Sequence, residues 1–152
     1  MKSLVIYDSQ FGNTAILAKS IAKSINCEAI SIKDFKNELL DNVDLLIIGS
    51  PTQGGLATKP IQEFINSLKI DKSTKIAVFD TRFSTKDHNM ALKLIIKTFG
   101  FASIKMAKQL ESIGFQMINK PKGFIVSGKK GPLKKDEIER ASEWAKNILI
   151  AI

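Results

Sequence analysis

The sequence has few of the residues on which disulfide, metal and membrane proteins depend. Cys27 is the only cysteine among 152 residues, which excludes an internal disulfide and a multi-cysteine metal or iron–sulfur site, and we interpret it as a small buried apolar residue. The apolar runs are far shorter than the roughly 20 residues of a membrane-spanning helix, so we expect no membrane insertion. The first residues run directly into a strand pattern without the apolar region of a signal peptide, which predicts a cytoplasmic protein.

Several enzyme signatures are also missing. No Gly-x-x-x-x-Gly-Lys-Ser/Thr motif occurs, so a P-loop nucleotide hydrolase is unsupported. His88 is the only histidine and has no matching serine, cysteine or carboxylate, so we expect it in a surface loop without a catalytic role. Asp8 resembles part of the acidic pocket of a response-regulator receiver, but Gly-Ser-Pro at 49–51 stands where the phosphorylated aspartate is needed.

The chain is basic, with 23 Lys and Arg against 15 Asp and Glu and a formal net charge of +8. Only Arg82 and Arg140 are arginines, whereas nucleic-acid surfaces commonly use the planar guanidinium of arginine. The lysines are spread through every segment, and their tightest cluster brackets Gly131 and Pro132. We therefore favour a solvated lysine surface over a nucleic-acid-binding face.

Apolar residues recur in two patterns that alternate along the chain. Short continuous apolar runs predict buried parallel strands, and apolar residues three or four positions apart predict amphipathic helices. The expected strands are residues 4–7, 28–33, 43–50 and 75–80, followed by a last strand made of 114–119 and 123–128 and interrupted at Pro121. The expected helices are 13–25, 60–68, 89–99, 103–111 and 133–150, the last with Ile138, Ala141, Ala145, Ile148 and Leu149 facing the core.

This alternation predicts a single α/β domain over residues 1–152. Parallel strands need crossover connections, and the helices in those connections cover both faces of the sheet. Five strands fit a chain of this length, and no repeat, low-complexity tract or linker divides it. In open sheets of this kind, ligands bind at the carboxyl ends of the strands, where the chain turns toward the helices.

The first expected strand is followed by a polar loop of Ser9, Gln10, Phe11, Gly12, Asn13 and Thr14. Gly12 permits a backbone conformation that other residues avoid, and side-chain donors lie beside the free N–H groups of a helix start. Such a loop can hold a phosphate without lysine or arginine, because the helix dipole favours an anion at its N-terminus. The same residues equally allow a simple helix cap by Asn13 or Thr14.

Two further strands end in informative residues. The third is followed by Pro51, Thr52, Gln53, Gly54 and Gly55, whose paired glycines permit close approach to a flat ligand. The fourth ends in Asp80, Thr81, Arg82 and Phe83. Because parallel strands end at the same edge of a sheet, we expect the three loops to meet, which favours a ligand site over a simple cap.

Taken together, these stretches resemble the flavodoxin-like FMN-binding family. The resemblance rests on SQFGNT at 9–14, GSPTQGG at 49–55, FDTRF at 79–83 and GFIVSGKKGPLKKDEIERASEWAK at 123–146, and it extends over nearly the whole chain. It implies a three-layer sandwich with a five-stranded parallel sheet in the order 2-1-3-4-5. It also implies FMN as the cofactor, with the phosphate in the first loop and the isoalloxazine ring between the second and third.

The sequence departs from the flavodoxin pattern in three ways. Phe11 stands where many flavodoxins have a second hydroxyl. Electron-carrying flavodoxins often stack aromatic side chains on the ring, but residues 51–58 contain none, so Phe83 is the obvious candidate, with Tyr7 and Trp144 expected in the core. The family is usually acidic, whereas this basic chain disfavours docking to the usual basic faces of reductases.

Three functions stay open at this point. The first is a flavodoxin-like protein that binds FMN and transfers electrons between redox partner proteins inside the cell, without catalytic side chains. The second is a small flavin-dependent NAD(P)H or quinone reductase, in which residues 84–101 form or cover an open pocket. The third is a binding module that keeps the fold and has lost tight flavin binding, as the missing ring aromatics indicate.

Overall fold

The computed structural model describes residues 1–84 and 89–152 and contains a five-stranded parallel sheet. The strand order is β2-β1-β3-β4-β5, which confirms the order predicted from the resemblance. The strands are β1 (Ser3–Tyr7), β2 (Glu28–Ser31), β3 (Leu45–Pro51), β4 (Lys75–Phe83) and β5 (Lys122–Val126).

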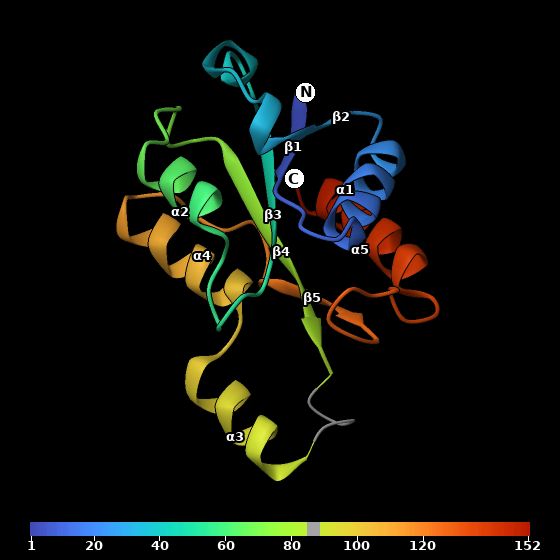
Figure 1. Cartoon of the computed structure of the whole chain (residues 1–152). Coiled ribbons are helices and arrows are strands. Elements are labelled where there is room, and N and C mark those ends of the chain that lie inside the picture. The colour runs from blue at the N-terminus through green and yellow to red at the C-terminus, as the bar shows by residue number, and fades with distance from the viewer. Residues whose placement is uncertain (85–88) are drawn as a thin grey trace.

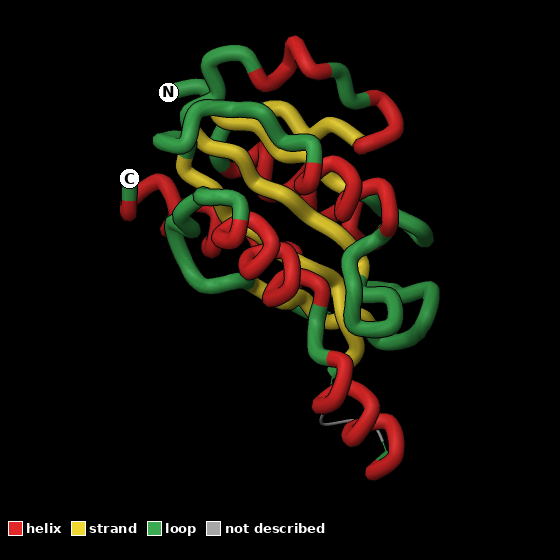
Figure 2. Tube along the Cα trace, turned by 90° about the vertical axis from the view of Figure 1, so that its left-hand side faces the viewer, coloured by secondary structure: helices red, strands yellow, loops and turns green. Residues whose placement is uncertain are grey.

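Helices cover both faces of the sheet and complete a three-layer sandwich (Figures 1 and 2). The helices α1 (Asn13–Ser24) and α5 (Glu137–Ala151) lie on one face, and α2 (Lys59–Asn66) and α4 (Ala102–Ser112) lie on the other. The helix α3 (Met90–Phe99) projects away from the sandwich instead of covering the sheet. None of the helices in the described ranges is long and apolar enough to cross a bilayer.

Alternating side chains of the strands build one hydrophobic core on each face. In β3, Leu46 and Ile48 pack toward α2 and α4, whereas Leu45 and Ile47 pack toward α1 and α5. This alternation follows from the period of two in a β-strand, and both faces are apolar because helices cover both. Tyr7 and Trp144 belong to the second core, as predicted.

The structure corrects several predicted boundaries. Residues 114–119 form no strand, and Met117 makes only an isolated bridge to Ile76. Ile138 is 43% exposed rather than buried, and the last helix begins at Glu137 and not at Leu133. His88 lies outside the described residues.

The largest difference concerns the fourth strand, which extends three residues beyond the predicted end. Thr81, Arg82 and Phe83 pair in register with Phe124, Ile125 and Val126 of β5, so they belong to a strand and not to a loop. The 3-10 helix η1 (Ile32–Asp34) begins where the prediction continued the second strand to residue 33, and a second 3-10 helix, η2 (Asn37–Leu40), follows it.

Candidate functional site

A cavity of about 420 Å³ lies at the carboxyl edge of the sheet. It is lined by every residue predicted for the site except Gly12 and Asp80. Its lining also includes Ile95, Ile96, Gly100 and Phe101, which belong to the segment 84–101 expected to form or cover a pocket in the reductase alternative, and Val126 and Lys129, which were not predicted for the site. The cavity forms where α1 and α2 leave the neighbouring strands β1 and β3 toward opposite faces of the sheet.

The loop after β1 turns tightly into α1 and leaves backbone donors free. Ser9 Oγ accepts hydrogen bonds from the N–H groups of Gly12 and Ala15, each at 3.2 Å. Gly12 has φ 97°, a left-handed conformation that favours glycine. The first helical bond runs from the Ile16 N–H to the Gly12 carbonyl at 3.0 Å, so the preceding first-turn N–H groups have no acceptor within the helix.

The electrostatics of this loop favour an anion. The first turn of α1 contains no acidic residue, so the partial positive charge of the helix N-terminus is not neutralised there. Asp8 stands just before the loop, but it is 8% exposed and its Oδ1 accepts the Ser9 N–H at 2.9 Å. The geometry is therefore that of a small anion cradle.

Asn13 and Thr14 do not cap the helix, so the simpler interpretation of this loop is wrong. The N-cap is Gly12, without a side-chain hydrogen bond. The Asn13 amide instead donates to the Lys130 carbonyl at 3.2 Å, and Thr14 Oγ1 lies 3.0 Å from Thr81 Oγ1. Both side chains connect the first loop to other segments of the carboxyl edge.

The loop after β3 closes in a tight turn with two left-handed glycines. Gly54 and Gly55 have φ 57° and 79°, and Gln53 and Leu56 exchange backbone hydrogen bonds at 2.8 and 3.0 Å. Positive φ at both central positions is the signature of a type I′ turn. The Gln53 amide donates to Gln10 Oε1 at 2.6 Å, so the first two loops are joined across the cavity mouth.

The wall from β4 contains a buried ion pair. Arg82 donates to both carboxylate oxygens of Asp80, at 2.7 and 2.6 Å, and its guanidinium lies 3.6 Å from the ring centroid of Phe101. Asp80 is fully buried and also accepts the Ser103 N–H at 2.9 Å. A Cβ at Gly123 would lie 2.2 Å from the Arg82 guanidinium carbon, so glycine on β5 leaves room for this side chain.

These contacts indicate that Asp80 positions Arg82 and does not itself face the cavity. Asp80 is excluded from the cavity lining and holds Arg82, while Arg82 stacks on Phe101 at the start of α4. Thr52 Oγ1 accepts the Ala102 N–H at 3.0 Å, which joins the second loop to the same helix start. A hydrogen bond and a stacking contact therefore connect the walls of the cavity to one another.

Comparison with known proteins identifies the family. A flavodoxin domain model matches residues 4–114. The chain belongs to the flavodoxin family. An uncharacterized protein of Methanocaldococcus jannaschii is 29% identical over 98% of this chain and 99% of its own length.

Solved flavodoxins share the fold. An archaeal flavodoxin superposes with a TM-score of 0.74 and 19% identity over 97% of this chain and 96% of its own. A Fusobacterium nucleatum flavodoxin mutant bound to flavin mononucleotide gives 0.66 and 17%, with coverage of 99% and 96%. A putative diflavin flavoprotein of Nostoc sp. is 38% identical over 48% of this chain, which covers only 15% of that protein.

The flavodoxin cavity of this chain has aromatic walls despite the missing aromatics at 51–58. Phe11, Phe83 and Phe101 all line it, from three different segments. Phe101 was not predicted as an aromatic residue of the ring site, because it lies 18 residues beyond Phe83 in the chain (101 − 83). The start of α4 brings it to the cavity. An aromatic residue directly before a helix was the only available signal.

Other reactive groups carry no comparable site. The described residues contain no cluster of His, Cys, Asp and Glu that could hold a metal ion. Cys27 packs partly buried against the second core, and burial, with a smaller effect from Glu28, raises the pKa of its thiol to about 11. The thiol therefore stays protonated at neutral pH, as expected for the packing role predicted for it.

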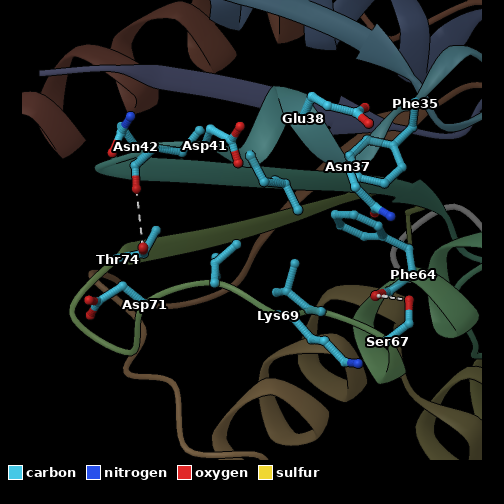
Figure 3. Close-up of a pocket in the computed structure, with 14 residues that line it drawn as sticks. Phe35, Asn37, Glu38, Asp41, Asn42, Phe64, Ser67, Lys69, Asp71 and Thr74 are labelled. Atoms are coloured by element: carbon cyan, nitrogen blue, oxygen red, sulfur yellow. Dashed lines mark hydrogen bonds between the residues drawn. The ribbon is translucent and has the colours of Figure 1, made fainter.

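A second and larger cavity, of about 750 Å³, lies at the amino edge of the sheet (Figure 3). It lies between the η2 segment and the connection that leads from α2 to β4, and Phe35 and Phe64 pack edge to face in its wall with ring centroids 4.9 Å apart. Its polar lining includes Glu38, Asp41 and Asp71.

Proposed function

We propose that this chain binds FMN at the carboxyl-edge cavity and transfers electrons between redox partner proteins. The observation that carries the proposal is that one cavity combines an anion cradle at Ser9–Thr14 with apolar walls that include aromatic side chains. A phosphate monoester attached to a flat aromatic ring needs both. The proposed setting is the cytoplasm, which stays a prediction from the sequence.

The first loop suits the phosphate of FMN. Ser9 accepts two backbone N–H groups, so its own hydroxyl proton points elsewhere and is available to an acceptor. The first-turn N–H groups of α1 supply further donors without a cationic side chain. Lys129 lines the same cavity and adds a positive charge from the β5–α5 connection.

The second loop and the β4 wall suit the ring. Gly54 and Gly55 bring backbone close to the cavity without side chains in between, and a Cβ at Gly54 would meet nothing within 4 Å. Phe101 presents an aromatic side chain to the cavity, and the Arg82 guanidinium that stacks on its ring lines the same cavity. Bound FMN would supply the redox chemistry, and these residues would orient the ring, exclude water from it and set the charge around it.

Titration with FMN and with riboflavin tests this proposal. We expect the purified protein to bind FMN at least about tenfold more tightly than riboflavin, because charge-assisted hydrogen bonds to phosphate are worth about 1.5–3 kcal/mol. Equal affinities would contradict the role of the cradle. Failure to bind either ligand would favour the flavin-free binding module, and rapid NAD(P)H or quinone turnover by the loaded protein would favour the reductase.

A matched pair of glycine variants locates the phosphate. Gly12→Ala introduces a side chain at φ 97° in the cradle, and Gly114→Ala does the same at φ 95° at the other edge of the sheet. Both added methyl groups have space, since the nearest atom is beyond 4 Å at Gly12 and 3.8 Å away at Gly114. Only Gly12→Ala should weaken FMN binding, while both variants lose similar stability through backbone strain.

A further inference from the structure

The rim of the carboxyl-edge cavity carries exposed lysines from two separate segments. Lys93 and Lys97 are exposed on α3, whose Ile95 and Ile96 line the cavity. Lys129 and Lys130 are exposed on the β5–α5 connection, and Lys130 Nζ lies 6.0 Å from the ring centroid of Phe11. Lys129 lines the cavity itself, and Lys93, Lys97 and Lys130 add positive charge on the two segments that contribute to its lining.

Carboxylates near this rim are largely buried or paired. Asp8 and Asp80 are 8% and 0% exposed, and Arg82 neutralises Asp80. Glu137 is paired with Arg140 at 2.6 Å. Among the described residues, the exposed acids close to this edge are Asp136 and Glu139 at the start of α5.

The opposite edge carries exposed charges of both signs. Glu38, Asp41 and Asp71 line the amino-edge cavity, and all three are exposed (Figure 3). Asp44 is exposed directly before β3 at the same edge. Lys69 lines the same cavity and Lys72 and Lys75 are exposed beside it, so the acidic residues of this edge lie among lysines.

An apolar strip joins the positive rim to the cavity. Met90, Leu94 and Ile95 of α3 are 82%, 65% and 50% exposed, and Ile95 also lines the cavity. Phe11 is 40% exposed on the other side of the mouth. Exposed apolar side chains bordered by lysines are typical of a protein-docking surface, in which charge selects and orients the partner.

We propose that this rim is the docking surface for an acidic electron-transfer protein, one that carries carboxylates around its own redox centre. The inference rests on the proposed FMN function, because docking at the rim brings the partner's centre to the mouth of the flavin cavity. The apolar strip alone fits several occupants, and the surrounding lysines select an acidic partner. A basic partner would meet like charges at Lys93, Lys97 and Lys130.

Binding of two redox proteins of opposite charge to the FMN-loaded protein tests the proposal. The probes are an acidic [2Fe–2S] ferredoxin and a basic c-type cytochrome, each titrated at about 20 mM and about 200 mM salt, conditions that shorten the Debye length about threefold. We expect the ferredoxin to bind and its affinity to fall at least about tenfold at the higher salt. Tighter binding of the cytochrome, or no ferredoxin binding, would overturn the proposal.

Charge-reversal variants separate the rim from the net charge. Lys93→Glu with Lys97→Glu should weaken ferredoxin binding at least about tenfold, and adding Lys130→Glu should weaken it further. The control pair is Lys69→Glu with Lys75→Glu, which changes the net charge equally at exposed positions of the amino edge. Equal losses from both pairs would overturn the docking surface.

The FMN affinity of each variant is measured first. Loss of FMN from the unmodified protein would contradict the proposed function and leave no loaded protein to dock. Retained FMN together with unchanged ferredoxin binding in the Lys93 and Lys97 variant would contradict the docking surface alone. The two failures are therefore distinguishable.

Discussion

The two edges of the sheet each hold a cavity, and the two cavities differ in size and in the backbone groups around them. The carboxyl-edge cavity measures about 420 Å³ and the amino-edge cavity about 750 Å³. Helices that follow parallel strands begin at the carboxyl edge and end at the amino edge. Free N–H groups and positive helix ends therefore gather at the first, and free carbonyls gather at the second.

Side-chain charge reinforces this difference in backbone chemistry. The amino-edge cavity adds Glu38, Asp41 and Asp71 to the carbonyl ends of helices, which makes it unsuitable for an anion. The carboxyl-edge cavity has its Asp80 neutralised by Arg82 and hidden from the lining. Direction of the backbone and placement of charge, as well as volume, distinguish the two cavities.

The largest expected effect comes from removing the buried carboxylate of the carboxyl edge. Asp80→Ala leaves Arg82 without its ion-pair partner and the Ser103 N–H without its carboxylate acceptor, so we expect a loss of about 3 kcal/mol in the free energy of unfolding. Asp41→Ala changes an exposed carboxylate at the amino edge and should have little effect. Urea denaturation of both variants checks this, and equal losses would contradict the structural role of Asp80.

The second expected difference between the two edges is the effect of acid on the stability of the fold. Burial pushes the pKa of the Glu137 carboxyl upward, but hydrogen bonds from Arg140 and the Ile125 N–H outweigh it and leave the pKa below its ordinary value of 4.5. A lowered pKa means that Glu137 stabilises the fold above about pH 4.5, and that this stabilisation is lost as the pH falls through the folded-state pKa.

The corresponding variant is Glu137→Gln, which should cost about 2 kcal/mol at neutral pH and progressively less on acidification. At the amino edge, Ser73 lowers the pKa of Asp71 through its backbone N–H and then its hydroxyl, but Asp71 is exposed. Asp71→Asn should show a much weaker pH dependence. Denaturant midpoints measured across the acid range test both, and a pH-independent difference for Glu137→Gln would refute the assignment.

Aromatic residues provide a third contrast. Phe101→Leu should lower FMN affinity about fivefold, the order expected for losing one aromatic stacking contact. Phe35→Leu removes an aromatic from the wall of the amino-edge cavity and should leave FMN affinity unchanged. Fluorescence titration measures both, and a spectral shift of the bound flavin in Phe101→Leu alone would strengthen the assignment. Equal affinities in the two variants would exclude Phe101 from the ring site.

The smallest expected effect concerns left-handed backbone positions, which are Gly54 at the carboxyl edge and Asn42 at the amino edge, both with φ 57°. Gly54→Ala should cost about 1 kcal/mol in stability, because alanine is strained there. Gly54→Asn should recover most of that loss, since asparagine tolerates this conformation, yet it should still weaken FMN binding by placing a side chain at the cavity. Full FMN affinity in Gly54→Asn would mean that close backbone approach is not needed.

Most of the fold was predictable because a buried parallel sheet produces a recognisable pattern of apolar residues in the sequence. Strands buried on both faces appear as continuous apolar runs, as at 45–48, and their carboxyl ends must share one edge. The prediction failed at 114–119, where a strand-like apolar pattern pairs only through Met117. It also failed at Ile138, because local spacing does not say where a helix begins relative to the core.

The candidate site was predictable to the extent that its residues lie at strand ends. Thirteen of the fifteen predicted residues line the cavity, since only Gly12 and Asp80 do not (15 − 2). The role of Asp80 was missed because a carboxylate at a strand end looks the same whether it faces a ligand or an arginine. Phe101 was missed because the contact with Arg82 is made across the fold and not along the chain.

The sequence by itself determined the strand and helix alternation, the glycines at left-handed turns and the basic net charge. Those properties are local, since each depends on a few neighbouring residues or on composition. Tertiary structure alone decided that Arg82 stacks on Phe101, that Asn13 and Thr14 connect loops, and that Glu38, Asp41 and Asp71 line one cavity. These are distances between residues far apart in the chain, and only the packed sheet and helices set them.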